Sequence, residues 1–450
     1  MAFEINSHFL NDFKELIDAN NSKEVKNLLE ELHYADVAEI VDELDFNRAL
    51  FVLNLLDSET TADILTELDD DTRERVLSSL SSKEIAENIE ELETDDAADI
   101  INELSEEQKK EVISHIEDVE HAKDIVDLLR YKENSAGGLM AKEFIEVNEN
   151  WTNLRCVKEM RKQAQELEKV HTIYVVDDDN KLIGILSLKN LLTTPAKTPI
   201  KEIYDDKVVA VKVDDRGEDI AQIMQKYDLV VLPVIDDLGV LVGQITIDDV
   251  VDFITEEAEK DYQMAAGISE DVDSDDSVLK LTRARLPWLL IGMVSGTFAA
   301  SIITDFQTVM KTAPALIIFI PLINSSAGNV GVQSSAIVVQ SIANKSFKGK
   351  LLTHIVKQLL IGLLNGLVMS LIVFGLSQFF FHTNLTISIT IAIALVTVII
   401  NAAVIGTVVP IVLNKLKIDP AIATGPFVTT SNDIFGILIY FMVAKFMLGF

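Results

Sequence analysis

The chain has a single cysteine, Cys156, among its 450 residues. One cysteine excludes a disulfide framework and a cysteine-based metal cage, so we expect an ordinary buried or half-buried thiol. Basic residues are also few, with 38 Lys and Arg against 72 Asp and Glu. The resulting net charge of −34 argues against a nucleic-acid partner, because phosphates are bound by Lys and Arg, and it favours cations as partners. A phosphate-binding G-x-x-x-x-G-K-[ST] string is missing too, so nothing predicts ATP-driven pumping.

Acidic residues almost disappear beyond Leu281, where only Asp305, Asp419 and Asp433 remain. The first 281 residues hold 69 Asp and Glu and 28 Lys and Arg, a net charge of −41, whereas the rest carries 3 and 10, a net charge of +7. A strongly acidic body is therefore joined to a hydrophobic membrane body. The chain starts without a basic and apolar leader, so we expect no secretory signal and a front part that stays in the cytosol.

Five apolar stretches in the back part are long enough to cross a hydrocarbon core of about 30 Å as helices. They are residues 287–303, 313–343, 351–379, 385–413 and 420–448. Clusters of Lys and Arg, which favour the cytoplasmic side, all fall on one side of these spans. The clusters are Arg283 with Arg285, Lys345 with Lys348 and Lys350, and Lys415 with Lys417. This pattern predicts a multi-pass protein of the cell membrane with the N-terminus inside and the C-terminus outside.

Polar and small residues gather in two of the spans. The second reads PLINSSAGNVGVQSS from Pro321 to Ser335, which suits either close helix packing or a backbone that lines a cavity. The fifth carries Asp433, 14 residues after Asp419, where an ionisable side chain is costly and marks a functional site unless it is merely paired structurally. We therefore expect Asp433 to bind a permeating cation. The neighbours expected to contribute oxygens or close approach are Asn329, Gly328, Gly425, Thr429 and Asp419.

A hydrophobic residue recurs every twelve positions from Leu32 to Ile116. Most of these residues have apolar partners three and four positions earlier, which predicts one short amphipathic helix per repeat. Short helices that cannot bury their faces alone stack into a superhelical domain, here residues 1–132. Such repeats are usually scaffolds, so we expect no catalytic role and no enzyme.

A second pattern, of mixed strands and helices, occurs twice after Gly137. IYVVDDDNKLIGILSLKNLL and LPVIDDLGVLVGQITIDDVV superpose with Asp177 on Asp236 and Gly184 on Gly243. The two segments resemble a tandem pair of CBS (cystathionine beta-synthase) domains, which we assign to residues 133–198 and 199–254. The resemblance implies an α+β fold and adenosine-nucleotide binding through a Ser/Thr-x-x-Asp motif, which Thr246 and Asp249 match. The first copy has Ser187 followed by Asn190 at these positions.

The chain as a whole resembles the MgtE family of magnesium channels and transporters. The strings that carry the resemblance are RLPWLL, PLINSSAGNVGVQSS and DPAIATGPFVTTSNDIFG, together with the order of repeat domain, CBS pair and acidic connecting helix. Ala327 departs from the family pattern of two glycines before Asn329, and Lys260 replaces the Glu that the family commonly has before Asp261. The connecting helix and linker span residues 255–282, and the transmembrane pore domain spans residues 283–450.

The resemblance implies a homodimer in the bilayer, with a pore at the subunit interface that the connecting, or plug, helix closes. It also implies that cytosolic Mg²⁺ binds between acidic faces, holds the soluble part compact and shuts off its own entry, with ATP as a modulator. The implied ligands of this sensor are Asp95, Asp96 and Asp99 in the repeats, Asp228, Asp249 and Asp252 in the second CBS domain, and Glu257, Glu259 and Asp261 in the plug helix.

Three alternatives stay open from the residues alone. A run of acids is usually only a solvated face, so the charge of the front part would then serve solubility. The CBS pair would suit a membrane-anchored nucleotide or cation sensor that transports nothing. Another dication, Mn²⁺ or Co²⁺, would suit the same oxygen ligands, although the lack of Cys and His near Asp433 argues against a soft metal.

Overall fold

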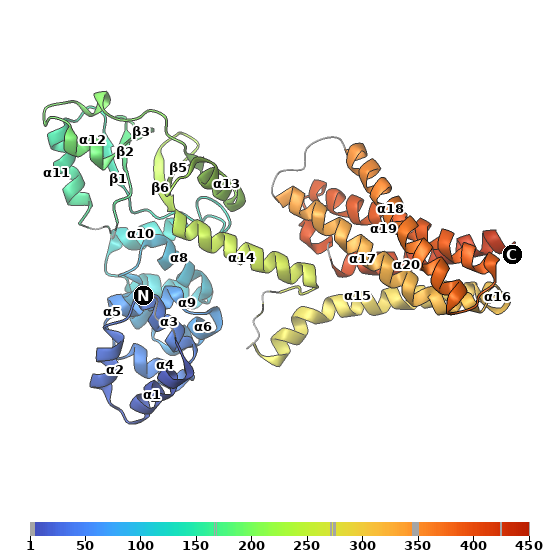
Figure 1. Ribbon diagram of the computed structural model, residues 1–450. Coiled ribbons are helices and arrows are strands. Elements are labelled where there is room, and N and C mark those ends of the chain that lie inside the picture. Colours follow the sequence, from blue (N-terminus) through green and yellow to red (C-terminus); the bar gives the residue numbers. More distant parts are fainter. Residues whose placement is uncertain are drawn as a thin grey trace. The chain divides into compact units, whose positions relative to one another are not determined.

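The computed structural model describes residues 5–165, 167, 169–270, 272, 276–343, 351–423 and 425–449. The chain forms two compact units, Met1–Thr255 and Glu256–Phe450 (Figure 1). Lys345, Lys348 and Lys350, which help to predict the orientation of the spans, lie outside the described residues.

Short α-helices of 8 to 12 residues build the first part of unit one. The twelve-residue repeat places a hydrophobic residue such as Leu68 or Leu104 at the end of a helix, where it is buried. An acidic or hydroxyl side chain such as Asp57 then caps the next helix. The predicted all-α repeat domain is confirmed. Its helices are Ser7–Asp18 (α1), Ser22–Leu29 (α2), Tyr34–Asp42 (α3), Phe46–Leu53 (α4), Ser58–Glu67 (α5), Asp70–Ser79 (α6), Ser82–Ile89 (α7), Thr94–Glu103 (α8), Glu106–His115 (α9) and Val119–Leu128 (α10).

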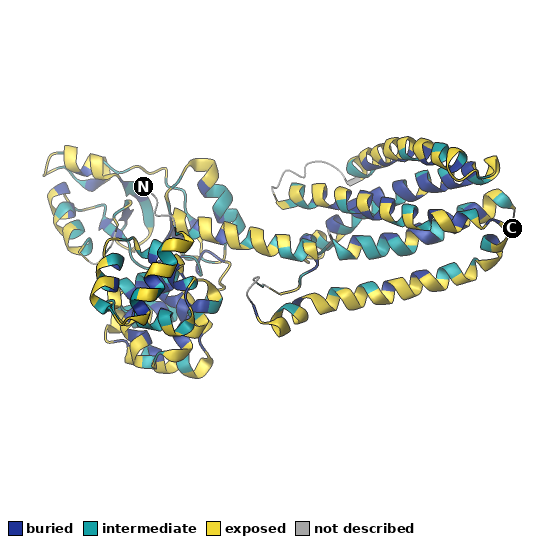
Figure 2. Cartoon of the chain, turned by 60° about the horizontal axis from the view of Figure 1, so that its bottom comes forward, coloured by how far each residue is buried: buried dark blue, intermediate teal, exposed yellow. Residues whose placement is uncertain are grey.

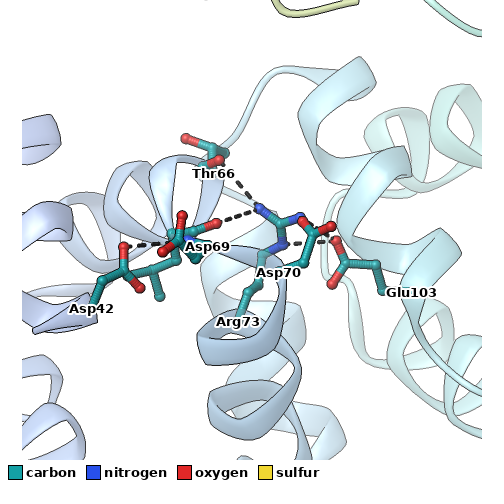
Figure 3. A network of polar contacts seen from close by, with 7 residues as sticks. Asp42, Thr66, Asp69, Asp70, Arg73 and Glu103 are labelled. Carbon is teal, nitrogen blue, oxygen red and sulfur yellow. Dashed lines mark hydrogen bonds and ion pairs between the residues drawn. The ribbon is translucent and has the colours of Figure 1, made fainter. Parts of the chain in front are cut away.

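A largely buried arginine ties two of these helices together (Figure 3). The side chain of Arg73 in α6 is 15% exposed and contacts the carboxylate of Glu103 in α8 at 2.6 Å and that of Asp70 at 2.6 Å. Its guanidinium also donates to the main-chain carbonyl of Leu68 at 2.9 Å. One cation thus offsets the repulsion between acids of neighbouring repeats, so here the excess of acid is neutralised within the chain.

Two small sheets follow in unit one, and they have the same strand order and directions. In each sheet the first strand pairs parallel with the second, which pairs antiparallel with the third. The tandem CBS fold predicted from the repeated sequence is therefore confirmed. The strands are Ile145–Asn148 (β1), Ile173–Val176 (β2), Leu182–Leu186 (β3), Val211–Lys212 (β4), Val231–Ile235 (β5) and Leu241–Thr246 (β6). The helices are Asn153–Gln163 (α11), Leu188–Thr193 (α12), Ile200–Glu202 (η1) and Gly217–Tyr227 (α13). Cys156, in α11, is buried and free.

The connecting helix α14, Ile247–Ala266, follows β6 directly and continues from unit one into unit two. The sequence predicts this helix from Asp248 to Met264, which agrees closely with the observed bounds.

Among the described residues, five helices of unit two are long and apolar enough to cross a membrane. They are Val278–Asp305 (α15), Ala315–Ala343 (α17), Leu351–Phe379 (α18), Leu385–Lys415 (α19) and Pro426–Leu448 (α20). The sequence prediction starts the fifth span at Pro420, which is wrong: Pro420–Ala423 forms a separate 3₁₀ turn (η2) and α20 begins at Pro426, since proline suits the first position of a helix. The short helix Gln307–Thr312 (α16) was not expected.

Burial differs strongly among the five helices (Figure 2). The core of unit two is built around α19, where Ile391, Leu395 and Val398 are almost fully buried against α17 and α20. In α15, by contrast, the buried residues are Ala284, Ser295 and Ala299, and long apolar side chains such as Phe298 are exposed. Such a face suits contact with lipid, because the exposure of long apolar side chains to water is unfavourable.

Candidate functional site

A cavity of about 280 Å³ lies between α17 and α20 in unit two. Its lining combines one carboxylate with amide, hydroxyl and glycine positions, and no Cys or His takes part. Oxygen donors of this kind suit hard dications, which prefer carboxylate, carbonyl and water ligands. The lining residues are Asn324, Ser325, Gly328, Asn329, Val332, Gln333, Thr429 and Asp433.

Four of the six predicted pore residues, Asp433, Asn329, Gly328 and Thr429, are brought together in this lining. Asp433 is half-buried in α20 and, among the residues that the structure describes, supplies the only carboxylate of the cavity. No described group of three or more His, Cys, Asp and Glu side chains is placed to hold a metal ion, so a cation in the cavity relies on neutral oxygens and water besides Asp433.

Small residues hold the two helices close enough to form the cavity. A Cβ atom at Gly331 would lie 2.7 Å from Val428 Cγ1, and one at Gly328 would lie 3.6 Å from Thr429 Cγ2. The amide of Asn432 donates to the carbonyl of Ala327 at 3.3 Å across the same contact. Of these two positions, the helices therefore approach each other more closely at Gly331, whereas a Cβ atom at Gly328 would make an ordinary van der Waals contact.

Gly425 and Asp419 have different surroundings from those expected. Neither lines the cavity in the part of the chain that the structure describes. A Cβ atom at Gly425 would collide with the carbonyl oxygen of Ala265, so this glycine lets the end of α14 meet the start of α20. Asp419 is exposed and accepts a hydrogen bond from the amide of Ala421 at 2.7 Å, which caps η2. Both residues shape the segment that leads into α20 and do not form part of the described cavity wall.

A second cluster, which we call the acidic interface, lies in unit one where α8 and the end of α5 meet the first turns of α14. Burial, together with the like charges of neighbouring acids, raises the pKa values of Glu67, Asp95, Asp96, Asp249 and Asp252, and the nearby His33 opposes the change at Glu67. The acidic interface consists of Glu67, Asp95, Asp96, Asp248, Asp249 and Asp252.

Burial dominates the electrostatics of the acidic interface. Asp95 is 7% exposed, and burial together with the nearby Asp249 raises its pKa well above the ordinary value. Burial and Asp249 also raise the pKa of Asp96 to about 7. Burial raises the pKa of Asp249 as well, although hydrogen bonds from Thr246 oppose the change. The buried charges are therefore costly at neutral pH unless a cation or a proton neutralises them.

Hydrogen bonds and an ion pair lie next to the acidic interface, at the start of α8. The Thr94 hydroxyl donates to the carboxylate of Glu143 at 2.7 Å and accepts from the amide of Lys142 at 2.9 Å. The ammonium group of Lys142 pairs with Asp127 at 2.7 Å. These contacts join the repeat domain to the segment that leads into the CBS pair.

The other predicted sensor residues lie apart from these groups or in unit two. Asp99 is exposed, although it lies in α8 like Asp95. Asp228 is exposed and ends α13 with a φ of 51°. Glu257, Glu259 and Asp261 belong to the unit-two part of α14, where Glu257 pairs with Lys260 at 3.3 Å. Lys260, the departure from the family pattern, thus engages one of the predicted acidic ligands.

The predicted nucleotide residues contact each other. The hydroxyl and the amide of Thr246 both donate to the carboxylate of Asp249, at 2.5 and 3.0 Å. In the first CBS copy the hydroxyl of Ser187 accepts from the amide of Asn190 at 3.2 Å. Both motifs lie at the start of their helices, and the second places a carboxylate there.

The sequence analysis does not name Glu67, Asp248 or Glu143 as site residues. Of the cavity lining, it includes Asn324, Ser325 and Gln333 only in the polar stretch of the second span and does not single out Val332. Glu67 and Glu143 come from segments with no motif, and only the fold brings them to the interface. Asp248 is adjacent to Asp249, and a count of acids at the start of α14 would have found it.

Comparison with protein families finds matches in both units of the chain. Residues 320–443 match the MgtE family, described as a divalent cation transporter, and residues 32–134 match the MgtE intracellular N domain. Residues 136–197 and 200–256 match the CBS domain.

Two curated relatives cover most of the chain. A magnesium transporter MgtE of Enterococcus faecalis is 36% identical over 335 residues, which are 74% of this chain and 73% of the relative. One of Thermus thermophilus is 33% identical over 341 residues, which are 73% of this chain and 75% of the relative.

Solved structures match the cytosolic part. The cytosolic domain of the Mg²⁺ channel MgtE in complex with ATP aligns with a TM-score of 0.51 and 33% identity, over 54% of this chain and 99% of that one. The soluble part of a magnesium transporter aligns with a TM-score of 0.50 and 30% identity, over 55% and 98%. The cavity, the five apolar helices, the CBS pair and these relatives lead to one conclusion: the chain belongs to the MgtE family of divalent cation transporters.

Proposed function

We propose that this protein is a channel for passive, inward Mg²⁺ flux, and that cytosolic Mg²⁺ bound to its acidic soluble part closes it. The observation that carries the proposal is the cavity between α17 and α20, in a unit whose described part has five apolar helices and places Asp433 as the one carboxylate of the cavity. The magnesium transporters named among the relatives give the substrate class.

The membrane potential is a sufficient driving force. Moving a dication inward gains about 4.6 kcal/mol per 100 mV, twice the value for a single charge. Closure by cytosolic Mg²⁺ requires the acidic unit to face the cytosol, which the Lys and Arg clusters favour for a protein of the cell membrane.

A second copy would complete the pore. One Asp433 supplies one negative charge, and two copies related by a twofold axis would supply two, which balances one Mg²⁺. Ser325 and Asn329 line the cavity and are exposed in a single chain. A homodimer with the cavity at its interface would cover these polar side chains.

The acidic interface supports the gating part of the proposal. Asp95 is buried and the neighbouring Asp96 and Asp249 are half-buried, and Mg²⁺ prefers such carboxylate oxygens together with its own water. Mg²⁺ there would stabilise the arrangement in which the repeat domain lies against the CBS pair. At low cytosolic Mg²⁺ the repulsion would favour separation, and α14 would transmit the change to the pore.

ATP is proposed as a modulator that binds at Thr246 and Asp249, because a cytosolic domain similar to this one was solved with ATP. No enzymatic activity is proposed. The alternative of a membrane-anchored sensor that transports nothing is less favoured, because it gives no role to the cavity that Asp433 lines.

Growth of a bacterial host that lacks its own magnesium uptake systems tests the proposal. The wild-type chain should restore growth at low Mg²⁺, and Asp433→Ala should not, at equal amounts of folded protein in the membrane. Asp419→Ala is the matched control, because it removes an exposed acid outside the cavity, and we expect it to restore growth. Full rescue by Asp433→Ala would remove this residue from the pathway.

A further inference from the structure

Asn324 in α17 has an amide oxygen without a partner. Its Oδ1 atom is buried and accepts no hydrogen bond within the described part of the chain. The same residue lines the cavity that holds Asp433. A buried acceptor that lacks a donor lowers stability, so a native structure that keeps one calls for an explanation.

The register of α17 and α20 gives the place of Asn324 along the cavity. A Cβ atom at Gly331 would contact Val428, and one at Gly436 would lie 3.7 Å from Ala327 Cβ, so the two helices run in opposite directions. Asp433 therefore lies level with residues 327 to 331 of α17. Asn324 precedes Gly328 by four residues, about one helical turn or 6 Å, toward the Ala315 end.

Gln333 lines the opposite end of the cavity. Nine residues separate it from Asn324, which is about 14 Å along the helix axis. The polar lining is thus longer than one ion, and Asp433 lies between its two ends. An ion that enters from the Ala315 end meets Asn324 before it meets Asp433.

The water shell of Mg²⁺ offers the hydrogen-bond donors that Asn324 Oδ1 lacks in the described part of the chain. Mg²⁺ gives up its water reluctantly, and the O–H groups of that water are hydrogen-bond donors that point outward from the ion. A neutral amide oxygen accepts such hydrogen bonds without holding the ion as firmly as a carboxylate does. An apolar residue at this position would leave the water shell without a partner there.

We propose that Asn324 forms a second cation-contact position one helical turn before Asp433, in which rotation of the side-chain amide turns the buried, unpartnered Oδ1 atom into the cavity, where it accepts hydrogen bonds from the water shell of the dication. This position rests on the proposed function, because it serves the same pathway. It sets the concentration at which Mg²⁺ enters, whereas Asp433 is required for passage itself.

The test uses the full-length protein in liposomes, with Mg²⁺ influx followed by an enclosed Mg²⁺-sensitive dye across a range of outside Mg²⁺ concentrations. Asn324→Leu keeps the branching of the side chain and removes the oxygen. Asn324→Asp keeps the oxygen and adds charge. Asn365→Leu is the matched control, because Asn365 is an exposed asparagine in α18 that does not line the cavity.

For Asn324→Leu we expect the half-saturating Mg²⁺ concentration to rise about tenfold, with the maximal flux retained, since a hydrogen bond to a charged group is lost. Asn324→Asp should give a value at or below that of the wild type, and Asn365→Leu should not differ from it. A merely structural role of Asn324 would lower the maximal flux or the protein yield instead of shifting the half-saturating concentration.

An unchanged half-saturating concentration in Asn324→Leu overturns the inference, and so does an equal shift in Asn365→Leu or in Asn324→Asp. The proposed function fails separately, when the wild-type protein conducts no Mg²⁺ in the same liposomes.

Discussion

Replacing Asp96 by asparagine tests whether the acidic interface stores the repulsion that gating needs. Burial and Asp249 raise the pKa of Asp96 from 3.8 to about 7. A shift of this size corresponds to about 4 kcal/mol in favour of the protonated form. Because Asp95 and Asp249 share the penalty, we expect Asp96→Asn to stabilise the contact between α8 and α14 by about 2 to 4 kcal/mol when the carboxyl groups are ionised.

The sign of the pH dependence follows from the raised pKa. The contact is fully stable below the ordinary pKa of about 4, and it loses this stability as the pH rises through about 7. At about pH 8 without Mg²⁺, Asp96 is ionised, and the wild-type contact between α8 and α14 is destabilised by the full cost of that buried charge. Added Mg²⁺ should then stabilise it strongly, whereas at about pH 5 protons already neutralise Asp96 and Mg²⁺ should add little.

Thermal unfolding of the detergent-solubilised protein, followed by tryptophan fluorescence in EDTA and in millimolar Mg²⁺, measures the effect. In EDTA at about pH 8, Asp96→Asn should raise the unfolding midpoint of unit one by about 2–4 °C for each kcal/mol recovered. It should also shrink the further rise caused by Mg²⁺. Glu91→Gln is the control, because it removes one charge from an exposed position in the same domain. A midpoint that falls in Asp96→Asn, or that changes as much in Glu91→Gln, would refute the reasoning.

Two further predictions concern the nucleotide motif and the helix contact. Asp249→Ala should abolish ATP binding in calorimetric titration, and heats equal to those of the wild type would separate this residue from the nucleotide site. Gly331→Val should prevent α17 and α20 from packing, because a Cβ at this position already meets Val428 at 2.7 Å, and should lower the unfolding midpoint of unit two. Gly292→Val is its control, since a Cβ at Gly292 meets nothing within 4 Å, and equal losses in both variants would contradict the prediction.

The sequence predicts the elements of this fold well, because the patterns that form them are local. The twelve-residue period places a hydrophobic residue such as Leu68 or Leu104 at a helix end, and the apolar stretches are long enough to identify five spans. Asp433 is recognisable because an isolated carboxylate in an apolar stretch is rare. Contacts between distant segments leave no such trace. Glu143 reaches Thr94 across 49 positions, and the unpartnered oxygen of Asn324 depends on what surrounds it in the folded chain. The predicted start of α20 is too early, because the residues of η2 are as apolar as those of a span. Only the backbone conformation distinguishes η2 from α20.

Mg²⁺ influx into liposomes without ATP, driven by a potential that is negative inside the vesicle, tests the central claim most directly. The vesicle interior must hold the acidic unit, which protease protection of that unit establishes. We expect the wild-type protein to conduct Mg²⁺ until Mg²⁺ inside the vesicle rises and closes it, and we expect Asp433→Ala to conduct none. Influx that needs ATP, or that continues unchanged in Asp433→Ala, would contradict a passive channel whose pathway passes Asp433.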